Sequence, residues 1–302
     1  MRNFLMSGAA LLLISGAGFM VITKPQHVDA AAFAALTPDP AHGKEVYDAG
    51  GCASCHWAPG AEGEARDLLS GGQSIASAFG TFYVPNISSD IAEGIGGWST
   101  VDLANALLKG TGPEDEHLYP ALPYASYAHM TPQDVADLRA YLATLPADPT
   151  PNKPHEVGFP FNIRALLGGW KLLYLKSDWV VTGPLTAEEE RGRYLAEGPG
   201  HCGECHSPRD VLGGIDRTRW LAGAPNPSGR GRIPNITPGG LDWTVDDITE
   251  YLTSGFTPDF DSAGGEMVYV IDHFALLPES DRRAVAAYLK KVPAVENPPG
   301  DG

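Results

Sequence analysis

Two copies of one five-residue motif contain every cysteine of the chain. The first runs from Cys52 to His56 (CASCH) and the second from Cys202 to His206 (CGECH). In the pattern C-x-x-C-H, the two thiols can form thioethers with the vinyl groups of a haem, and the adjacent histidine is placed to bind its iron. The sequence therefore predicts two covalently bound haem c groups, with thioethers at Cys52, Cys55, Cys202 and Cys205 and iron ligands at His56 and His206.

Other uses of paired cysteines fit the pattern less well. Zinc ribbons usually separate their two C-x-x-C pairs by about 15 to 20 residues, whereas Cys55 and Cys202 are 147 positions apart. A redox-active pair of thiols does not require a histidine directly after its second cysteine. Covalent haem attachment is the interpretation that uses every residue type of both motifs.

Each iron needs a second axial ligand, for which a methionine sulfur or a second histidine is the usual choice. Beyond residue 22 the chain has only two methionines, Met130 and Met267, each downstream of one motif. A soft thioether favours ferrous iron and so raises the reduction potential. We expect both methionines to be axial ligands. The alternatives are that they fill the core, or that His129, His117 or His273 takes their place.

Three further side chains are candidates for contacts with haem propionates. Trp98 and Trp243 follow the two motifs at matching places, and an indole N–H is a suitable donor to a carboxylate, although packing alone explains them equally well. Arg209 follows the second motif and could neutralise a propionate, although a lone arginine in a loop is usually solvated.

Composition and charge bound the possible partners. The chain has 302 residues, 43% of them hydrophobic, with 36 glycines and 26 prolines, which predicts two loop-rich globular domains. Its formal net charge is −16. Nucleic acid is excluded as a partner because nothing neutralises phosphates, whereas a basic protein partner would be attracted from a distance.

The N-terminus carries an apolar run from Phe4 to Ile22, preceded by Arg2 and followed by Lys24. This arrangement predicts either a cleaved export signal or a retained membrane anchor. The run is long enough to span a bilayer, and a possible cleavage site at Val28–Ala30 lies well beyond it, so we favour the anchor. Either outcome places the remainder outside the cytoplasm, where bacterial haem attachment takes place.

An internal repeat organises the rest of the chain. Pro85–Ile87 recurs as Pro234–Ile236, and Trp98–Asp102 recurs as Trp243–Asp247. The offset is 150 at the first cysteines, 149 at the asparagines and 145 at the tryptophans. Such regular spacing predicts two copies of one haem module in tandem.

Helix signals recur in both copies and predict an all-α fold wrapped around each porphyrin. A helix over 41–49 precedes the first motif, and one from Thr186 precedes the second. Later helices begin at the caps Ser99 and Thr244, at Thr131 and at Pro278. The expected divisions are a signal or anchor over 1–22, a tether over 23–40, modules over 41–147 and 186–296, a linker with a connector helix over 148–185, and a tail over 297–302.

The connector helix is expected over 161–175. It is apolar nearly all round, but it is too short to span a membrane and contains Arg164 and Lys171. We favour a helix buried between the modules, with an interfacial membrane helix as the alternative.

Several longer phrases of the chain resemble a known family. GIGGW at 94–98, LYPALPY at 118–124, YAHMT at 127–131 and HCGECHSPR at 201–209 are similar to the cytochrome c subunits of membrane-bound alcohol, gluconate and sorbitol dehydrogenases. The likeness covers roughly residues 40–296. It implies that Met130 and Met267 are axial ligands, and that electrons come from a flavin- or quinoprotein dehydrogenase on the periplasmic side and go to ubiquinone or a terminal oxidase.

Those subunits typically carry three haem modules, and this sequence has two motifs. We therefore expect a two-haem carrier rather than an enzyme, on the periplasmic side of the bacterial inner membrane. It would be anchored at its N-terminus, or soluble if the signal is cleaved. It would relay single electrons from a dehydrogenase to an oxidase, a soluble cytochrome c or a quinone. The alternative is a haem enzyme, similar to dihaem peroxidases, with one open or displaceable axial position.

Overall fold

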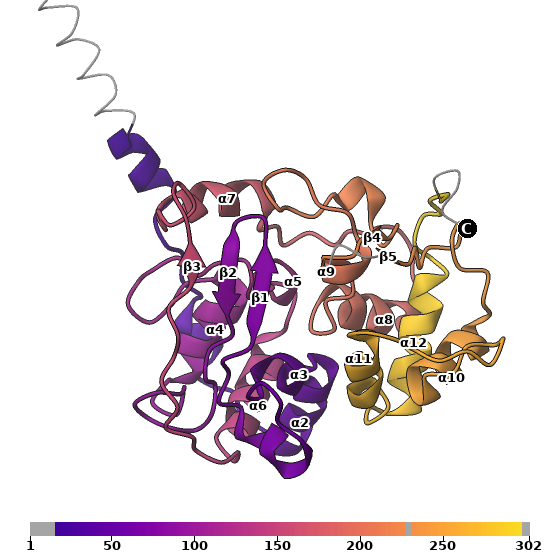
Figure 1. The fold of residues 1–302 in the computed structure, drawn as a ribbon, viewed down its shortest axis with the longest axis horizontal. Helices are drawn as coiled ribbons and strands as arrows, with labels where there is room; N and C mark the ends of the chain where they lie inside the picture. Colours follow the sequence, from indigo (N-terminus) through magenta and orange to yellow (C-terminus); the bar gives the residue numbers. More distant parts are fainter. Residues whose placement is uncertain (1–15, 228–230, 298–302) are drawn as a thin grey trace, which may run out of the picture.

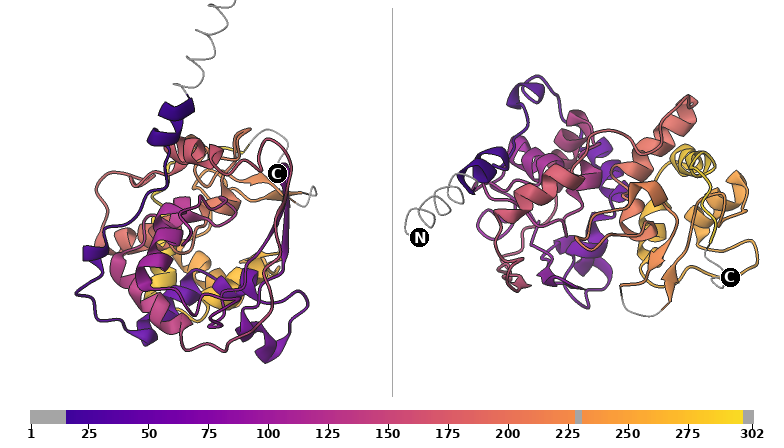
Figure 2. Two further views of the ribbon diagram at one scale, coloured as in Figure 1. Left: turned by 90° about the vertical axis from the view of Figure 1, so that its left-hand side faces the viewer. Right: turned by 90° about the horizontal axis from the view of Figure 1, so that it is seen from above.

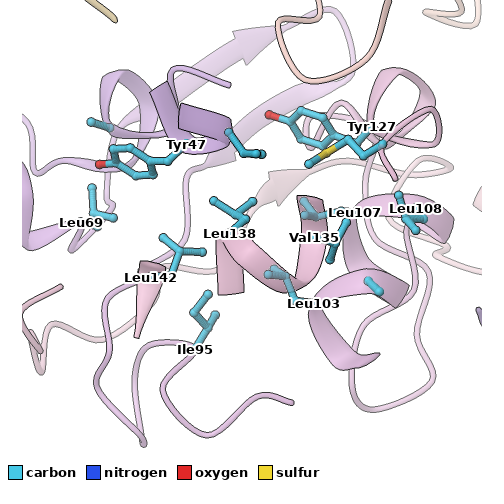
Figure 3. Packing of buried hydrophobic residues seen from close by; sticks show 14 of the residues in the cluster. Tyr47, Leu69, Ile95, Leu103, Leu107, Leu108, Tyr127, Val135, Leu138 and Leu142 are labelled. Atoms are coloured by element: carbon cyan, nitrogen blue, oxygen red, sulfur yellow. The ribbon is translucent and has the colours of Figure 1, made fainter. Parts of the chain in front are cut away.

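Helices dominate the structure (Figure 1). They gather around two clusters of buried hydrophobic side chains. The computed structural model describes residues 16–227 and 231–297. The first cluster is built from residues between Val46 and Leu142, and its packing is shown in Figure 3. The second is built mainly from residues between Val181 and Val292. Each half of the chain therefore has a core of its own.

The helices of the two halves follow one order along the chain. The first half contains α2 (Pro40–Ala49), α3 (Cys52–His56), α4 (Thr100–Lys109), α5 (Tyr124–Tyr127) and α6 (Pro132–Leu142). The second half contains α8 (Ala187–Glu197), α9 (Gly203–His206), α10 (Val245–Ser254), α11 (Met267–Phe274) and α12 (Glu279–Leu289). Between them lies α7 (Leu166–Tyr174).

The helix starts predicted from the sequence are confirmed where their capping residues can be checked. Ser99 and Asp102 form a reciprocal capping box at the start of α4, and Thr244 and Asp247 form the same box at α10. Thr131 accepts a hydrogen bond from the backbone of Asp134 at the start of α6. Each cap satisfies backbone N–H groups that have no partner within the helix.

The first and last helices of each half cross at a glycine. A side chain at Gly43 of α2 would overlap the carbonyl of Asp137 in α6, and one at Gly192 of α8 would overlap the carbonyl of Ala284 in α12. Glycine is required at both points because the two backbones lie in contact there. In each half, the helix before the C-x-x-C-H motif thereby packs against the last helix of that half.

Two small sheets are additions to the all-α fold that the sequence predicted. β1 (Ser74–Ser77) and β2 (Gly80–Tyr83) form an antiparallel hairpin, and β3 (Glu156–Val157) pairs with β2. β4 (Ala224–Pro225) pairs with β5 (Arg232–Ile233). The pairing of β3 brings the start of the linker back against the first half. Sequence periodicity could not reveal this pairing because strands of two to four residues carry almost no pattern.

The connector helix α7 lies on the surface, and the prediction that it is buried is wrong for most of its length. Only Gly168 and Lys171 are buried, whereas Leu166, Leu172 and Leu173 are exposed. The two halves contact one another directly, so α7 lies beside them rather than between them (Figure 2).

Most of the apolar run predicted as an anchor or signal lies outside the described residues, which begin at Gly16. Residues 16–22 are helical. Over residues 16–227 and 231–297, none of the helices combines the length and hydropathy that crossing a membrane requires.

Candidate haem-binding sites

The histidines of both motifs are held in the same way by a backbone carbonyl. The Nδ1 atom of His56 lies 2.8 Å from the carbonyl oxygen of Pro85, and that of His206 lies 2.8 Å from the carbonyl oxygen of Pro234. Because a carbonyl can only accept, Nδ1 carries the proton, and the lone pair is at Nε2. Burial lowers the pKa of His56 to about 4 and also lowers that of His206. Both rings are therefore neutral at pH 7, as an iron ligand must be.

The four cysteines sit on or beside the short helices α3 and α9. All four are free of disulfides. Cys52 packs against the first cluster and Cys202 against the second, and burial raises the pKa of each to about 12. Cys55 and Cys205 are exposed, and each lies one turn along from its partner on the same side of the helix. Two thiols and one neutral imidazole on adjacent turns make a donor set suited to covalent haem c.

Each methionine lies in the same hydrophobic cluster as the first cysteine of its motif. Met130 is 6% exposed and belongs to the first cluster, against which Cys52 packs. Met267 is partly buried and packs against the second cluster, as Cys202 does. The structure thus brings together, in each half, the cysteine and the methionine that the sequence predicted. The apolar surroundings suit a porphyrin, and the residues present fit the group.

The two methionines nevertheless occupy different places in the repeated fold. Met130 directly precedes the N-cap of α6, and its backbone N–H donates to the carbonyl oxygen of Tyr127 over 2.9 Å. In the second half this position belongs to Leu277, which precedes the N-cap of α12 and donates to Phe274 over 3.0 Å. Met267 instead begins α11. The segments that carry the two sulfurs therefore differ in conformation.

The rival histidine ligands lie in different surroundings, and the Nδ1 atoms of His117 and His273 are buried without a hydrogen-bond partner. His129 has Nδ1 3.1 Å from the carbonyl of Ser126 and Nε2 3.3 Å from that of Asp178. His117 is buried beneath α7, where a side chain at Gly168 would touch its Nε2. His273 belongs to the second half but points at the first, with Nδ1 3.8 Å from Asp48.

The side chains proposed to contact haem propionates differ in whether they already have a hydrogen-bond partner in the protein. Trp98 and Trp243 are half-buried and pack against the first and second clusters respectively, and within the described residues neither indole N–H donates to a protein acceptor. Arg209 is already engaged, since its guanidinium forms an ion pair with Glu204 and donates to the carbonyl of Gly213. Sequence spacing could not show that Arg209 has this nearby partner.

The two attachment motifs lie close to the contact between the halves. The Nε2 atom of His201, next to Cys202, donates to the carbonyl of Gly50 over 3.2 Å. Ser126 of α5 donates to Glu204 of α9 over 3.0 Å. The rings of Trp57 and Tyr269 meet edge to face, with centroids 5.2 Å apart. None of these contacts was predicted, because no local pattern encodes which surfaces of two domains meet.

A cavity of about 750 Å³ lies between α7 and both halves. Its wall includes Trp170, Tyr174 and Trp220, together with Arg217, but no cysteine or methionine of the candidate haem sites. Arg217 is paired with Asp178 at 2.9 Å. The cavity wall also includes Glu204 of the second motif and Arg209 just after it, so the cavity adjoins that motif.

Comparison with known proteins identifies the family of the chain. The profile of the family described as cytochrome c matches residues 40–146. A protein of Cereibacter sphaeroides described as "Diheme cytochrome c-type" is 59% identical over 296 residues, which cover 98% of this chain and 100% of the relative. The fructose dehydrogenase cytochrome subunit of Gluconobacter japonicus is 35% identical, over 94% of this chain and 58% of the relative. The gluconate 2-dehydrogenase cytochrome c subunit of Pantoea cypripedii is 33% identical, over 87% of this chain and 63% of the relative.

The chain spans less than two thirds of the two dehydrogenase subunits but the whole length of the dihaem relative. The resemblance to cytochrome c subunits of dehydrogenases is thus confirmed, and so is the prediction of two covalently bound haem c groups. The chain belongs to the dihaem c-type cytochromes.

Proposed function

We propose that the protein relays single electrons through two tandem cytochrome c modules, residues 41–147 and 186–296, joined by a linker over 148–185. The observation that carries the proposal is the pair of equal hydrogen bonds, at 2.8 Å, from His56 to Pro85 and from His206 to Pro234. Both fix a neutral imidazole with its Nε2 lone pair available. An iron held on both sides by protein ligands exchanges electrons without binding a substrate.

Each residue of the candidate sites has a proposed role. Cys52 with Cys55, and Cys202 with Cys205, form the thioethers, while His56 and His206 ligate iron through Nε2. Met130 and Met267 would supply the second ligand of each iron, and Trp98 and Trp243 would donate to propionates. Haem c, when bound, supplies the one-electron chemistry of its iron. The chain would control the burial of the haem and the type and orientation of its ligands, and these influence the reduction potentials.

We propose a dehydrogenase as electron donor and a respiratory component as acceptor: an oxidase, a soluble cytochrome c or a quinone. The similarity to the cytochrome subunits of a fructose dehydrogenase and a gluconate 2-dehydrogenase supports this donor class. The net charge of −16 favours a partner with a basic docking surface. The proposed location is the periplasmic side of the inner membrane, with residues 1–22 as anchor or signal and residues 23–40 as tether.

The experiment is a reductive titration of the purified holoprotein, followed by exposure to carbon monoxide. We expect two electrons per chain, with no spectral change on adding carbon monoxide to the reduced protein and no rapid consumption of peroxide by the oxidised protein. Substantial carbon monoxide binding or peroxide turnover would instead support the alternative, a haem enzyme with one open or displaceable axial position.

Variants of the motifs test the assignment of the two sites separately. Replacing Cys52 and Cys55 together with alanine should lower the mass by one haem and leave one redox centre. Replacing Cys202 and Cys205 should do the same for the other centre. Loss of both haems in either variant would mean that the two halves do not bind haem as separate modules.

A further inference from the structure

The helix that includes residues 16–22 lies against α7. A side chain at Gly168 would overlap the carbonyl of Thr23, and one at Gly169 would come within 3.2 Å of the ring of Phe19. Thr23 ends the helix by donating its N–H to Phe19 over 2.9 Å. Figure 1 shows this helix leaving the molecule beside α7, and the seen-from-above view in Figure 2 shows the same arrangement. The two glycines therefore let two apolar segments, far apart in sequence, pack side by side.

The orientation of α7 is set by a buried lysine. Lys171 is 7% exposed, and its Nζ atom donates to the carbonyl of Gly110 over 2.5 Å and lies 5.3 Å from the centroid of the Tyr124 ring. At 3.6 residues per turn, Leu166 and Leu173 project from the opposite side of the helix. They are 46% and 56% exposed. An apolar row consequently points away from the protein.

Neighbouring segments extend this apolar surface. Large hydrophobic side chains are also exposed in the loop before α7 and in the N-terminal helix: Phe159, Phe161, Ile163, Met20, Val21 and Ile22. We call the surface formed by residues 16–23 and 159–173 the α7 face. Among the described residues, nothing covers it, and an apolar patch of this kind marks an interaction site.

The charge of the α7 face is opposite to that of the rest of the protein. The chain has 37 Asp and Glu against 21 Lys and Arg. Yet there is no acidic residue before Asp29, and none from Val157 to Ser177. The exposed basic residues of this second stretch are Arg164 and Lys176, whereas Lys171 is buried on the protein side of α7. Basic residues that flank exposed apolar side chains are typical of helices that lie in the headgroup region of anionic bilayers.

We propose that the α7 face rests on the surface of an anionic lipid bilayer, with α7 lying in the interfacial region parallel to the membrane. A bilayer is favoured over a protein partner because residues 16–22, the described end of the apolar sequence that starts at Phe4, pack against α7 at this face. One membrane surface would then receive both α7 and the N-terminal helix. Contact along α7 would fix how the two haem-attachment motifs are oriented above the membrane. The proposal does not depend on which dehydrogenase donates electrons.

The test is hydrogen–deuterium exchange of the full-length holoprotein, with and without vesicles of phosphatidylglycerol and phosphatidylethanolamine. We expect backbone exchange across 159–175 to slow by about tenfold when the vesicles are present, because the local opening of α7 becomes restricted. Vesicles of phosphatidylcholine alone should slow it less, since they lack the anionic headgroups.

Paired substitutions separate contact by α7 from insertion of the N-terminal run. In L166D/L173D the vesicle-dependent slowing over 159–175 should be lost, although the chain still sediments with vesicles if the N-terminal run holds it there. The matched control is I91D/F260D, at positions 81% and 92% exposed and away from the α7 face. It should behave like the wild type.

Two outcomes would overturn the proposal. One is exchange over 159–175 that is unchanged by vesicles while the wild-type chain is bound to them. The other is protection of 159–175 that appears only when a dehydrogenase preparation is added in place of vesicles, which would make the α7 face a protein interface.

Discussion

The hydroxyl of Tyr194 in α8 donates a hydrogen bond to the carboxylate of Asp134 at the start of α6, and so joins the two halves. The other oxygen of that carboxylate lies 3.7 Å from Nδ1 of His42 in α2. Burial and the charge of Asp134 raise the pKa of Tyr194, so the hydroxyl remains protonated as a donor. One carboxylate thus links the first and last helices of the first half to the first helix of the second.

Removing this hydroxyl should weaken the contact between the halves. In Tyr194→Phe the partly buried carboxylate loses a donor, and we expect a loss of about 1 to 2 kcal/mol in the free energy of unfolding, measured by denaturant titration. Tyr251→Phe is the control, since within the described residues its hydroxyl has no hydrogen-bond partner, and it should change stability little. Equal effects of the two substitutions would contradict a role for the Tyr194 hydrogen bond.

The pair of His42 and Asp137 should make stability depend on pH. Burial opposes the charge on His42, but a 2.8 Å hydrogen bond to Asp137 and the charges of Asp134, Asp137 and Glu45 outweigh it and raise the pKa above 6.5. A raised pKa in the folded state contributes stability that is fully present below pH 6.5 and is lost as the pH rises through the folded value.

We therefore expect His42→Gln to destabilise the protein more at pH 6 than at pH 9, in unfolding titrations at both values. The pKa of Asp137 is lowered because backbone and side-chain donors, with His42 among them, outweigh its burial. The stability that Asp137 contributes through this lowered pKa is present above pH 3.8 and is lost at lower pH, which is outside the range from pH 6 to pH 9. A destabilisation that does not change between pH 6 and pH 9 would contradict the charge interaction.

The glycine crossings should tolerate no side chain. In Gly192→Ala the new methyl would overlap the Ala284 carbonyl and force α8 away from α12, which should cost about 1 to 3 kcal/mol or more. Gly264→Ala is the matched control because nothing lies within 4 Å of the added Cβ. Thermal unfolding should show a lower midpoint for the first variant only, and similar midpoints for both would mean that the crossing can relax.

Leucine substitutions test the two axial sulfurs. Met267→Leu and Met130→Leu should each remove about half of the long-wavelength absorption band of Met-ligated ferric haem and lower one reduction potential. Leucine suits position 130 because Leu277 occupies the equivalent place in the second half, so the fold should survive. An unchanged spectrum of Met130→Leu would instead mean that Met130 is a core residue, like Leu277 in the second half.

The sequence by itself determined the chemistry of this protein and its repeat. The C-x-x-C-H motifs bring their own geometry, because two cysteines and a histidine within five residues are presented together by a single helical turn. The capping pairs, such as Ser99 with Asp102, determined where helices begin for the same local reason. Residues close in sequence need no long-range packing to meet.

Only the tertiary structure decided how the elements pack. The Pro85 carbonyl contacts His56 across 29 positions of sequence, and Gly192 contacts Ala284 across 92 positions. The buried Lys171 binds the carbonyl of Gly110, so that the apolar side of α7 faces outward. Each contact depends on how two surfaces, far apart along the chain, fill space together. The hydrophobic pattern of α7 is compatible with a buried or an exposed helix, and the neighbours available to cover it decided between them.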